Sequence, residues 1–206
     1  MPNTRTVALS LPEAKRYADL SGVLADLAEV KRLCERFLRQ IESSPDPNWS
    51  DLEVLCVAAI IRYGRTLTTG VRKGIDHRMT DKLGPVDQIT HKLFRDLRDK
   101  WIAHSVNPFE ENQLVVWLRP RYLPGPTVIG VAIHQTRVTS LGPPDMTRLL
   151  LLASGLETLV ESELLLERDT VERIVADMDP AFLHNLPEAA QAKLPAMQVS
   201  CRTRRQ

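Results

Sequence analysis

Apolar residues recur every three or four positions along the first quarter of the chain. Charged residues fall largely on the other side of this stripe, which consists of Leu24, Leu27, Val30, Leu33, Phe37, Leu38 and Ile41. Such a spacing predicts an amphipathic helix opening near residues 12–13. Pro45 and Pro47 end it, because proline removes a backbone donor and biases the residue before it away from helical angles.

Two more helices are expected before residue 106. Ser50 and Glu53 have the spacing of a capping box, which predicts a second helix from about residue 50 to 67. Gly84-Pro85 predicts the start of a third, since proline suits the first helical position. We expect the third helix to end near residues 104–105. Its predicted apolar face consists of Ile89, Leu93, Phe94, Leu97 and Trp101.

The pattern then changes to that of a β-hairpin. Two runs of β-formers, 114–118 and 128–133, flank a segment rich in proline and glycine, which predicts a hairpin over about 113–138. Asp145 is expected to cap a leucine-rich helix that continues to about residue 178. A short helix and a flexible tail over about 186–206 complete the chain.

Together these elements predict a mainly α fold. We expect a bundle of about four long helices with a β-hairpin inserted between the third and fourth, as a single domain over residues 1–206. The first helix has a wide apolar arc and the fourth is rich in leucine. This excess of apolar surface favours a homodimer.

Composition narrows the classes of function. The chain has 27 Lys and Arg against 26 Asp and Glu, so nucleic-acid binding would need a local basic patch. The three cysteines show no metal-ligand spacing, and no nucleotide-binding loop is present, so we expect no metal and no cofactor. The N-terminus has no signal-like apolar segment, and the longest apolar run is far below the roughly 20 residues that span a bilayer. The expected location is cytoplasmic, without a membrane partner.

The residues best suited to catalysis stand at the end of the third predicted helix. Arg98 and His104 are six positions apart, in the string Arg98-Asp99-Lys100-Trp101-Ile102-Ala103-His104. Arginine offers a planar fork that binds phosphate, and histidine titrates near neutrality. No acidic residue lies three or four positions from Arg98. Its guanidinium can therefore serve something outside its own helix.

Helical geometry separates these two side chains. On a straight α-helix, residues six apart point about 120° away from each other. Either the helix unwinds near Ala103, or Arg98 and His104 of two chains meet in one cleft. Plainer roles stay open as well. His104 can cap the last carbonyls of the helix, and Arg98 can pair with a carboxylate on another helix.

The Arg98–His104 string resembles the R-x(4–6)-H motif of HEPN domains, with Asp99 as the polar residue after the arginine. The wider stretch 91–105 is similar to uncharacterised bacterial HEPN-like proteins. The resemblance implies a dimeric, metal-independent endoribonuclease of a toxin–antitoxin, abortive-infection or CRISPR system. It would act on RNA, and an antitoxin protein would be a partner. Arg98 would hold the phosphate, His104 would move the proton, and Asp99 would orient a neighbour. Ser105 and Val106 depart from family members with a modifiable tyrosine after the histidine, so that form of control is not implied.

Further basic and polar residues are candidates for nucleic-acid binding. Six cations lie between residues 62 and 82, with only Asp76 and Asp81 among them to offset their charge: Arg62, Arg65, Arg72, Lys73, Arg78 and Lys82. We interpret Arg72, Lys73 and Arg78 as an RNA-backbone track or as a solvated loop. His91 and Arg95 share a face with Arg98, and Asn107 follows His104. His91 is equally suited to a structural role, and Asn107 to a turn.

The leading hypothesis is therefore a HEPN-type endoribonuclease. The alternative is a non-catalytic helical module that binds nucleotide, nucleic acid or a protein partner, and a purely structural helical dimer is the third reading.

Overall fold

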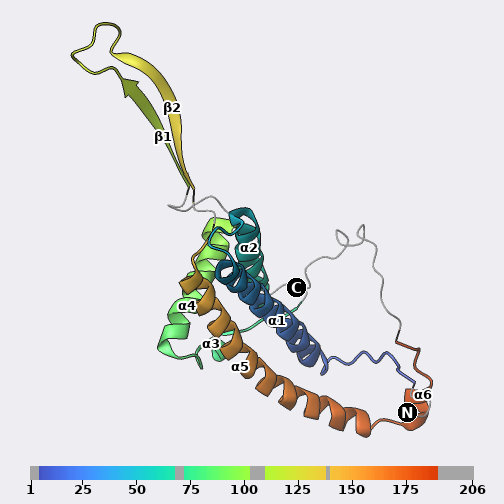
Figure 1. Ribbon diagram of the computed structural model, residues 1–206. Coiled ribbons are helices and arrows are strands. Elements are labelled where there is room, and N and C mark those ends of the chain that lie inside the picture. Colours follow the sequence, from blue (N-terminus) through green and yellow to red (C-terminus); the bar gives the residue numbers. More distant parts are fainter. Residues whose placement is uncertain (1–4, 68–71, 103–109, 138–139, 190–206) are drawn as a thin grey trace.

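Four long helices form the body of the protein, as Figure 1 shows. The computed structural model describes residues 5–67, 72–102, 110–137 and 140–189. Helix α1 contacts both α2 and α5 along their lengths, and α4 packs against α2 and α5. The long helices are α1 (Lys15–Ser43), α2 (Trp49–Thr66), α4 (Pro85–Leu97) and α5 (Pro143–Ala176), and the short ones are α3 (His77–Thr80) and α6 (Pro180–His184). The mainly α fold with an inserted hairpin is confirmed.

The core lies where these helices meet. Each long helix contributes fully buried side chains, including Phe37, Tyr63, Phe94 and Leu152. The stripe predicted for α1 faces this core, and Leu27 is among its fully buried members. Burying one such side chain stabilises the fold by about 1.5–3 kcal/mol.

Two helices begin differently from the sequence prediction. The N-cap of α2 is Asn48, whose side chain accepts a hydrogen bond from the backbone N–H of Ser50 at 3.1 Å. Ser50 therefore lies inside the helix, and the capping box was a wrong prediction. Helix α5 begins after Gly142, with Asp145 in its first turn rather than at its cap. The start of α4 at Gly84 and Pro85 is confirmed.

Helix α4 and the turn after it bury only part of the predicted face, including Trp101. Phe94 and Leu97 are buried, but Ile89 is 72% exposed and Leu93 is 39% exposed. Thr90 is buried instead of Ile89 and Leu93. Its hydroxyl keeps a hydrogen-bond partner inside the protein, because it donates to the carbonyl of Val86 at 2.9 Å. Helix period alone does not reveal this rotation, since neighbouring helices decide which side is covered.

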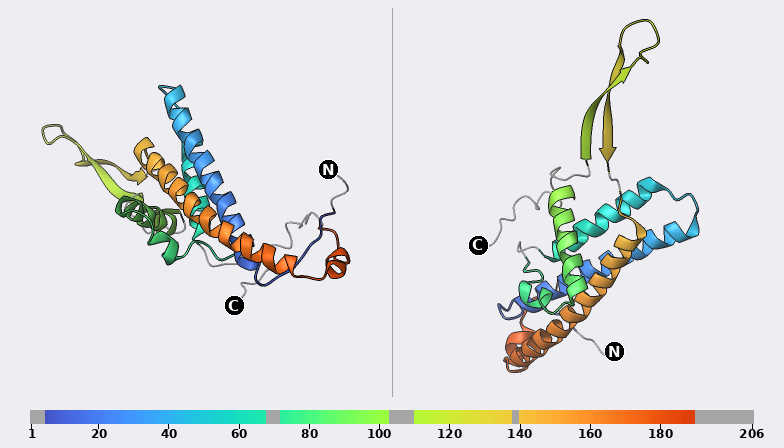
Figure 2. Two further views of the ribbon diagram at one scale, coloured as in Figure 1. Left: turned by 90° about the horizontal axis from the view of Figure 1, so that it is seen from below. Right: turned by 90° about the vertical axis from the view of Figure 1, so that its left-hand side faces the viewer.

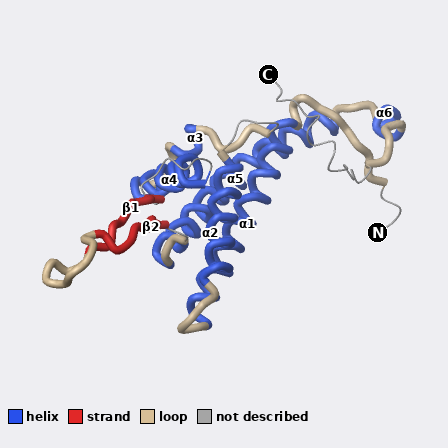
Figure 3. The backbone as a smooth tube through the Cα atoms, turned by 90° about the horizontal axis from the view of Figure 1, so that it is seen from above, coloured by secondary structure: helices blue, strands red, loops and turns tan. Residues whose placement is uncertain are grey.

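The hairpin projects from the helical body as an arm, seen from different sides in Figures 1 and 2. Its strands β1 (Glu110–Leu118) and β2 (Val128–Arg137) are antiparallel, with Val116 opposite Val131. These bounds agree with the predicted 113–138 to within three residues. Figure 3 shows the two strands lying apart from the long helices α1 and α5.

The two ends of the described chain lie together. Val7 forms a β-bridge with Glu188, and the guanidinium of Arg5 donates to the carbonyls of His184 and Leu186 at 2.8 and 2.9 Å. The first residues of the expected tail are thus tied to the N-terminal segment, and 190–206 lie outside the described residues. None of the described helices combines the length and apolarity of a membrane-spanning segment.

Candidate active site

The backbone leaves α-helical geometry at Arg98. Helix α4 ends at Leu97, and a five-residue π-helix, η1 (Arg98–Ile102), continues from it. The third helix is expected to end near residues 104–105, with unwinding near Ala103 as one alternative; α-helical geometry ends earlier, at Leu97, and the π-helical turn continues to Ile102. Such π-turns are rare and occur frequently at functional sites. Trp101 is buried and anchors the turn, while Arg98 and Asp99 remain partly exposed.

The stem of Arg98 lies on a glycine of α2. A Cβ placed on Gly64 would be 2.7 Å from Cγ of Arg98, closer than any real contact allows. Gly64 is thus the residue that admits Arg98. The guanidinium Nη1 donates to Oδ1 of Asp99 at 2.5 Å, and the two side chains are 41% and 48% exposed. The two residues are adjacent in the chain, whereas the prediction of an unpaired guanidinium rested on the residues three and four positions from Arg98.

Tyr63 and His91 form a second contact between α2 and α4. The Tyr63 hydroxyl lies 2.6 Å from Nδ1 of His91. Burial raises the pKa of Tyr63, and burial together with the charge of Arg95 lowers the pKa of His91. The hydroxyl therefore stays protonated beside a neutral imidazole, and the two groups share a hydrogen bond whose donor depends on the imidazole tautomer. His91 thus has a structural partner in Tyr63.

The structure thus gathers several predicted site residues on α4 and η1. Arg98 and Asp99 pair directly, and the charge of Arg95 reaches His91 and Tyr63. His104 and Asn107 lie outside the described residues. Tyr63 and Gly64 are the site residues that sequence analysis missed, although a glycine inside a helical pattern marks a close approach.

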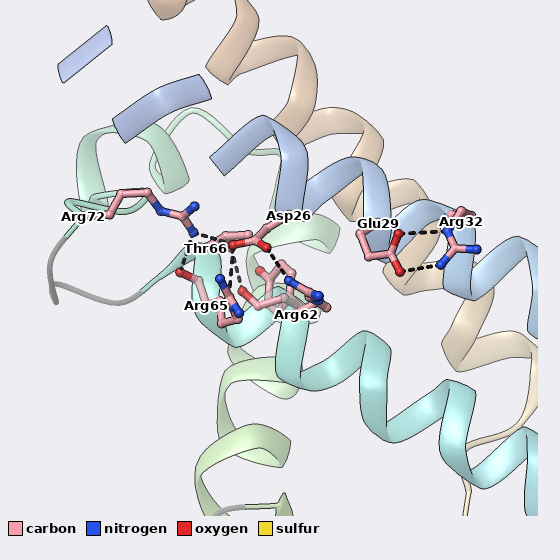
Figure 4. A network of polar contacts seen from close by, with 8 residues as sticks. Asp26, Glu29, Arg32, Arg62, Arg65, Thr66 and Arg72 are labelled. Atoms are coloured by element: carbon pink, nitrogen blue, oxygen red, sulfur yellow. Dashed lines mark hydrogen bonds and ion pairs between the residues drawn. The ribbon is translucent and has the colours of Figure 1, made fainter. Parts of the chain in front are cut away.

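The basic cluster of the sequence converges on a buried carboxylate, as Figure 4 shows. Asp26 of α1 is 4% exposed, and it accepts from Arg62 at 3.1 Å and from Arg72 at 2.5 Å. Nε of Arg65 lies 3.4 Å from the same carboxylate. The expectation that only Asp76 and Asp81 offset these cations is wrong, since Asp26 is far from them in sequence and adjacent in space.

Asp26 is ionised despite its burial. Burial raises the pKa of Asp26, but hydrogen bonds from Arg72 and Arg62 and the charges of Arg72 and Arg65 outweigh it and hold the pKa below 3.8. Three guanidiniums then surround one carboxylate, which leaves an excess of two positive charges (3 − 1) at this place. Their side chains are 41%, 56% and 24% exposed, in the order Arg62, Arg65 and Arg72.

The other two members of the predicted track lie elsewhere. Lys73 and Arg78 line an open pocket of about 610 Å³ beside the N-terminal end of α1. The backbone N–H of Lys73 donates to Asp19 at 3.0 Å, and its ammonium lies 3.8 Å from Asp76. Five cations and five carboxylates line this pocket, so its formal charge balances and does not favour an anion. The predicted track is therefore divided between two places.

One helix end connects the arginine cluster with the Arg98 site. Arg62 and Arg65 of α2 face Asp26, whereas Tyr63 and Gly64 face α4 and η1. Successive residues of an α-helix point about 100° apart, so both groups fit on the last two turns of α2. Arg62 and Arg65 therefore lie on one side of this helix end, and Arg98 lies on the other.

Comparison with known proteins adds no family. No family model matches the chain, and neither a curated protein nor a solved structure does. Among the described residues, no three His, Cys, Asp or Glu side chains come together as a metal site requires. What supports a function is therefore the local chemistry around Arg98.

Proposed function

We propose that this protein is a metal-independent endoribonuclease of the HEPN type. It acts in the cytoplasm as a homodimer, as a toxin or phage-defence component, with an antitoxin protein as its natural partner in the toxin case. Arg98 binds the scissile phosphate, His104 transfers the proton, and Asp99 orients the guanidinium.

The observation that carries this proposal is the placement of Arg98. Its stem is held against Gly64 at the first residue of a π-turn, and its guanidinium is partly open to solvent. The Asp99 pair is exposed, and such pairs contribute only about 0–1 kcal/mol. A phosphate that accepts two parallel N–H bonds competes well with so weak a pair. The site therefore suits a phosphodiester better than a carboxylate of the protein itself.

The proposed chemistry is internal transesterification of RNA. The 2′-hydroxyl attacks the adjacent phosphorus and gives up its proton, the bond to the 5′-oxygen breaks, and that oxygen takes a proton. The products carry a 2′,3′-cyclic phosphate and a 5′-hydroxyl. Arg98 stabilises the negative charge that develops on phosphate oxygens, an effect typically worth about 10²–10³ in rate. One imidazole cannot accept and donate at the same moment, so His104 of a second copy supplies the other role.

Purified protein incubated with mixed RNA in EDTA tests the proposal. Wild type should leave cyclic phosphate ends, and both Arg98→Ala and His104→Ala should lower the rate about 10²–10³-fold. Lys92→Ala, an exposed cation on the same helix α4, is the matched control and should cleave like wild type. Equal cleavage by wild type and His104→Ala would identify a contaminant and end the enzyme proposal.

One observation favours the alternative of a non-catalytic binding module. The two excess positive charges around Asp26 can attract a nucleic-acid backbone without any reaction. In that case RNA or nucleotide binds but is not cut, and the affinity falls steeply with salt. Substitution of Arg62 or Arg72 would then weaken binding of all sequences alike, whereas substitution of Lys73, which lies in the charge-balanced pocket, would not.

A further inference from the structure

The hairpin arm has a wide apolar face. Residues directly opposite each other in an antiparallel pair lie on the same side of the sheet. On one side of the arm, three successive pairs are wholly apolar: Leu114 with Ile133, Val116 with Val131 and, beyond a register shift after Trp117, Leu118 with Val128. All six side chains are exposed, from 44% at Val116 to 68% at Leu114.

The opposite face of the arm is different. Trp117 lies across Gly130, where an added Cβ would be 3.0 Å from the indole. Val115 and Ala132, which form the next pair, are only partly exposed. Gln113 and His134 then continue this face with polar groups. Trp117 is itself 60% exposed, so this face also presents apolar surface, but its apolar pairs are only two and end at Gln113 and His134.

A hairpin with such a face needs something to pack against. No third strand joins β1 and β2 within the described chain. A lone two-stranded hairpin is at best marginally stable in water. Six apolar side chains that are about 60% exposed leave roughly 500 Å² of open apolar surface, as large as the largest patch on a typical monomer. Such a patch marks an interaction site.

The pattern of this face fits a second copy of itself. Val116 and Val131 occupy the centre, and each flanking pair combines one leucine with one β-branched residue. A two-fold axis that runs along the arm, midway between its strands, would place Leu114 of one copy on Ile133 of the other and Val116 on Val131, so side chains of similar volume meet and both helical bodies lie at the same end. The six residues carry no charge, so the face does not repel its own copy. Interfaces between identical subunits are more apolar than those of transient complexes.

We propose that this face is a homodimer interface, in which the arms of two copies pack against each other. The two hairpins would form a two-layer sandwich with sheets about 10 Å apart. The six residues supply most of the roughly 800 Å² that each partner buries in a standard interface. Two exposed apolar residues at the tip of the arm, Tyr122 and Leu123, add to this apolar area. The proposal does not depend on RNA cleavage.

Sedimentation equilibrium of the full chain tests the interface. Wild type should be a dimer, and Val131→Glu should raise the dissociation constant at least about tenfold, because a charge would be buried without a partner. His134→Glu places the same charge on the opposite face and should leave the dimer unchanged. Circular dichroism should show the same helix content in all three proteins, since the arm lies outside the helical core.

Cross-linking provides an independent test of the packing geometry. In a Cys201→Ser background, Val116→Cys lies near the proposed axis and should be joined to its copy by a bis-maleimide with a short spacer, because sheets about 10 Å apart are too far for a direct disulfide. Trp117→Cys, on the opposite face, should not. A wild-type protein that stays monomeric at high concentration would overturn the proposal. If that monomer bound vesicles of neutral phosphatidylcholine, the apolar face would be assigned to a lipid surface instead of a second copy. A dimer that Val131→Glu leaves intact and Val116→Cys does not cross-link would overturn it too.

Discussion

Asp26 is expected to be the most sensitive charged position in the described structure. Its carboxylate is 4% exposed and receives Arg62 at 3.1 Å, Arg72 at 2.5 Å and Arg65 at 3.4 Å. Asp26→Asn keeps the volume but removes the charge. An asparagine also turns an amide donor toward at least one guanidinium, so at least one of these contacts becomes repulsive.

The exposure of each arginine determines the size of the effect. Arg72 is 24% exposed, and a hydrogen bond to a charged group of this kind contributes about 1.5–3 kcal/mol. Arg62 and Arg65 are 41% and 56% exposed, so solvent screening reduces each of their contributions to about 0–1 kcal/mol. The free energy of unfolding should therefore fall by about 1.5–5 kcal/mol. In a chain of 206 residues this lowers the thermal midpoint by about 3–20 °C.

Thermal and urea unfolding followed by circular dichroism measure this loss. Glu29→Gln is the matched control, because Glu29 lies one turn along α1 and hydrogen-bonds the exposed Arg32, with only a weaker charge interaction with Arg62. That variant should change the free energy of unfolding by less than about 0.5 kcal/mol. If Asp26→Asn and Glu29→Gln lowered the midpoint equally, the arginine cluster would not stabilise the fold as described.

The same pair of proteins has a defined pH dependence. Because the folded pKa of Asp26 is below 3.8, its stabilising effect is fully present above the unfolded pKa and disappears as pH falls through the folded pKa. The difference between wild type and Asp26→Asn should be constant near neutrality and shrink below about pH 3.9. A difference that grew on acidification would contradict the assignment.

Three further outcomes follow from the contacts of α2 and α4 and from the buried thiol of Cys34. Gly64→Ala should be destabilising in wild type but stabilising in an Arg98→Ala background, with a coupling of at least about 1 kcal/mol, because the three atoms nearest the added Cβ all belong to Arg98. Additive unfolding energies in that double-mutant cycle would refute the contact. Since His91 has a pKa below 6.5 when folded, wild type should lose stability as pH falls below 6.5, and His91→Gln should lose less over that range. Burial and the neighbouring Cys56 raise the pKa of Cys34 to about 12, so iodoacetamide at pH 8 should label Cys34 only after unfolding, as peptide mass spectrometry would show.

Local signals in the sequence predicted most of the fold. The 3.6-residue stripe of α1, the glycine and proline before α4 and the alternation of the arm each depend on neighbours within a few positions. The predicted bounds of α2 and of the hairpin are correct to within three residues. The helix caps were less predictable, because Asn48 and Ser50 are both good N-cap residues and only the backbone angles distinguish them.

The sequence by itself determined where the long helices and the hairpin lie and that Arg98 stands near the end of a helix. Only the tertiary structure decided that Asp26 neutralises part of the basic cluster, that Gly64 receives Arg98 and that Ile89 remains exposed. The physical reason is the distance along the chain between the residues that make contact. Secondary structure follows from contacts within a turn or a strand pair, whereas a buried ion pair or a covered helix face depends on which distant segments the topology brings together.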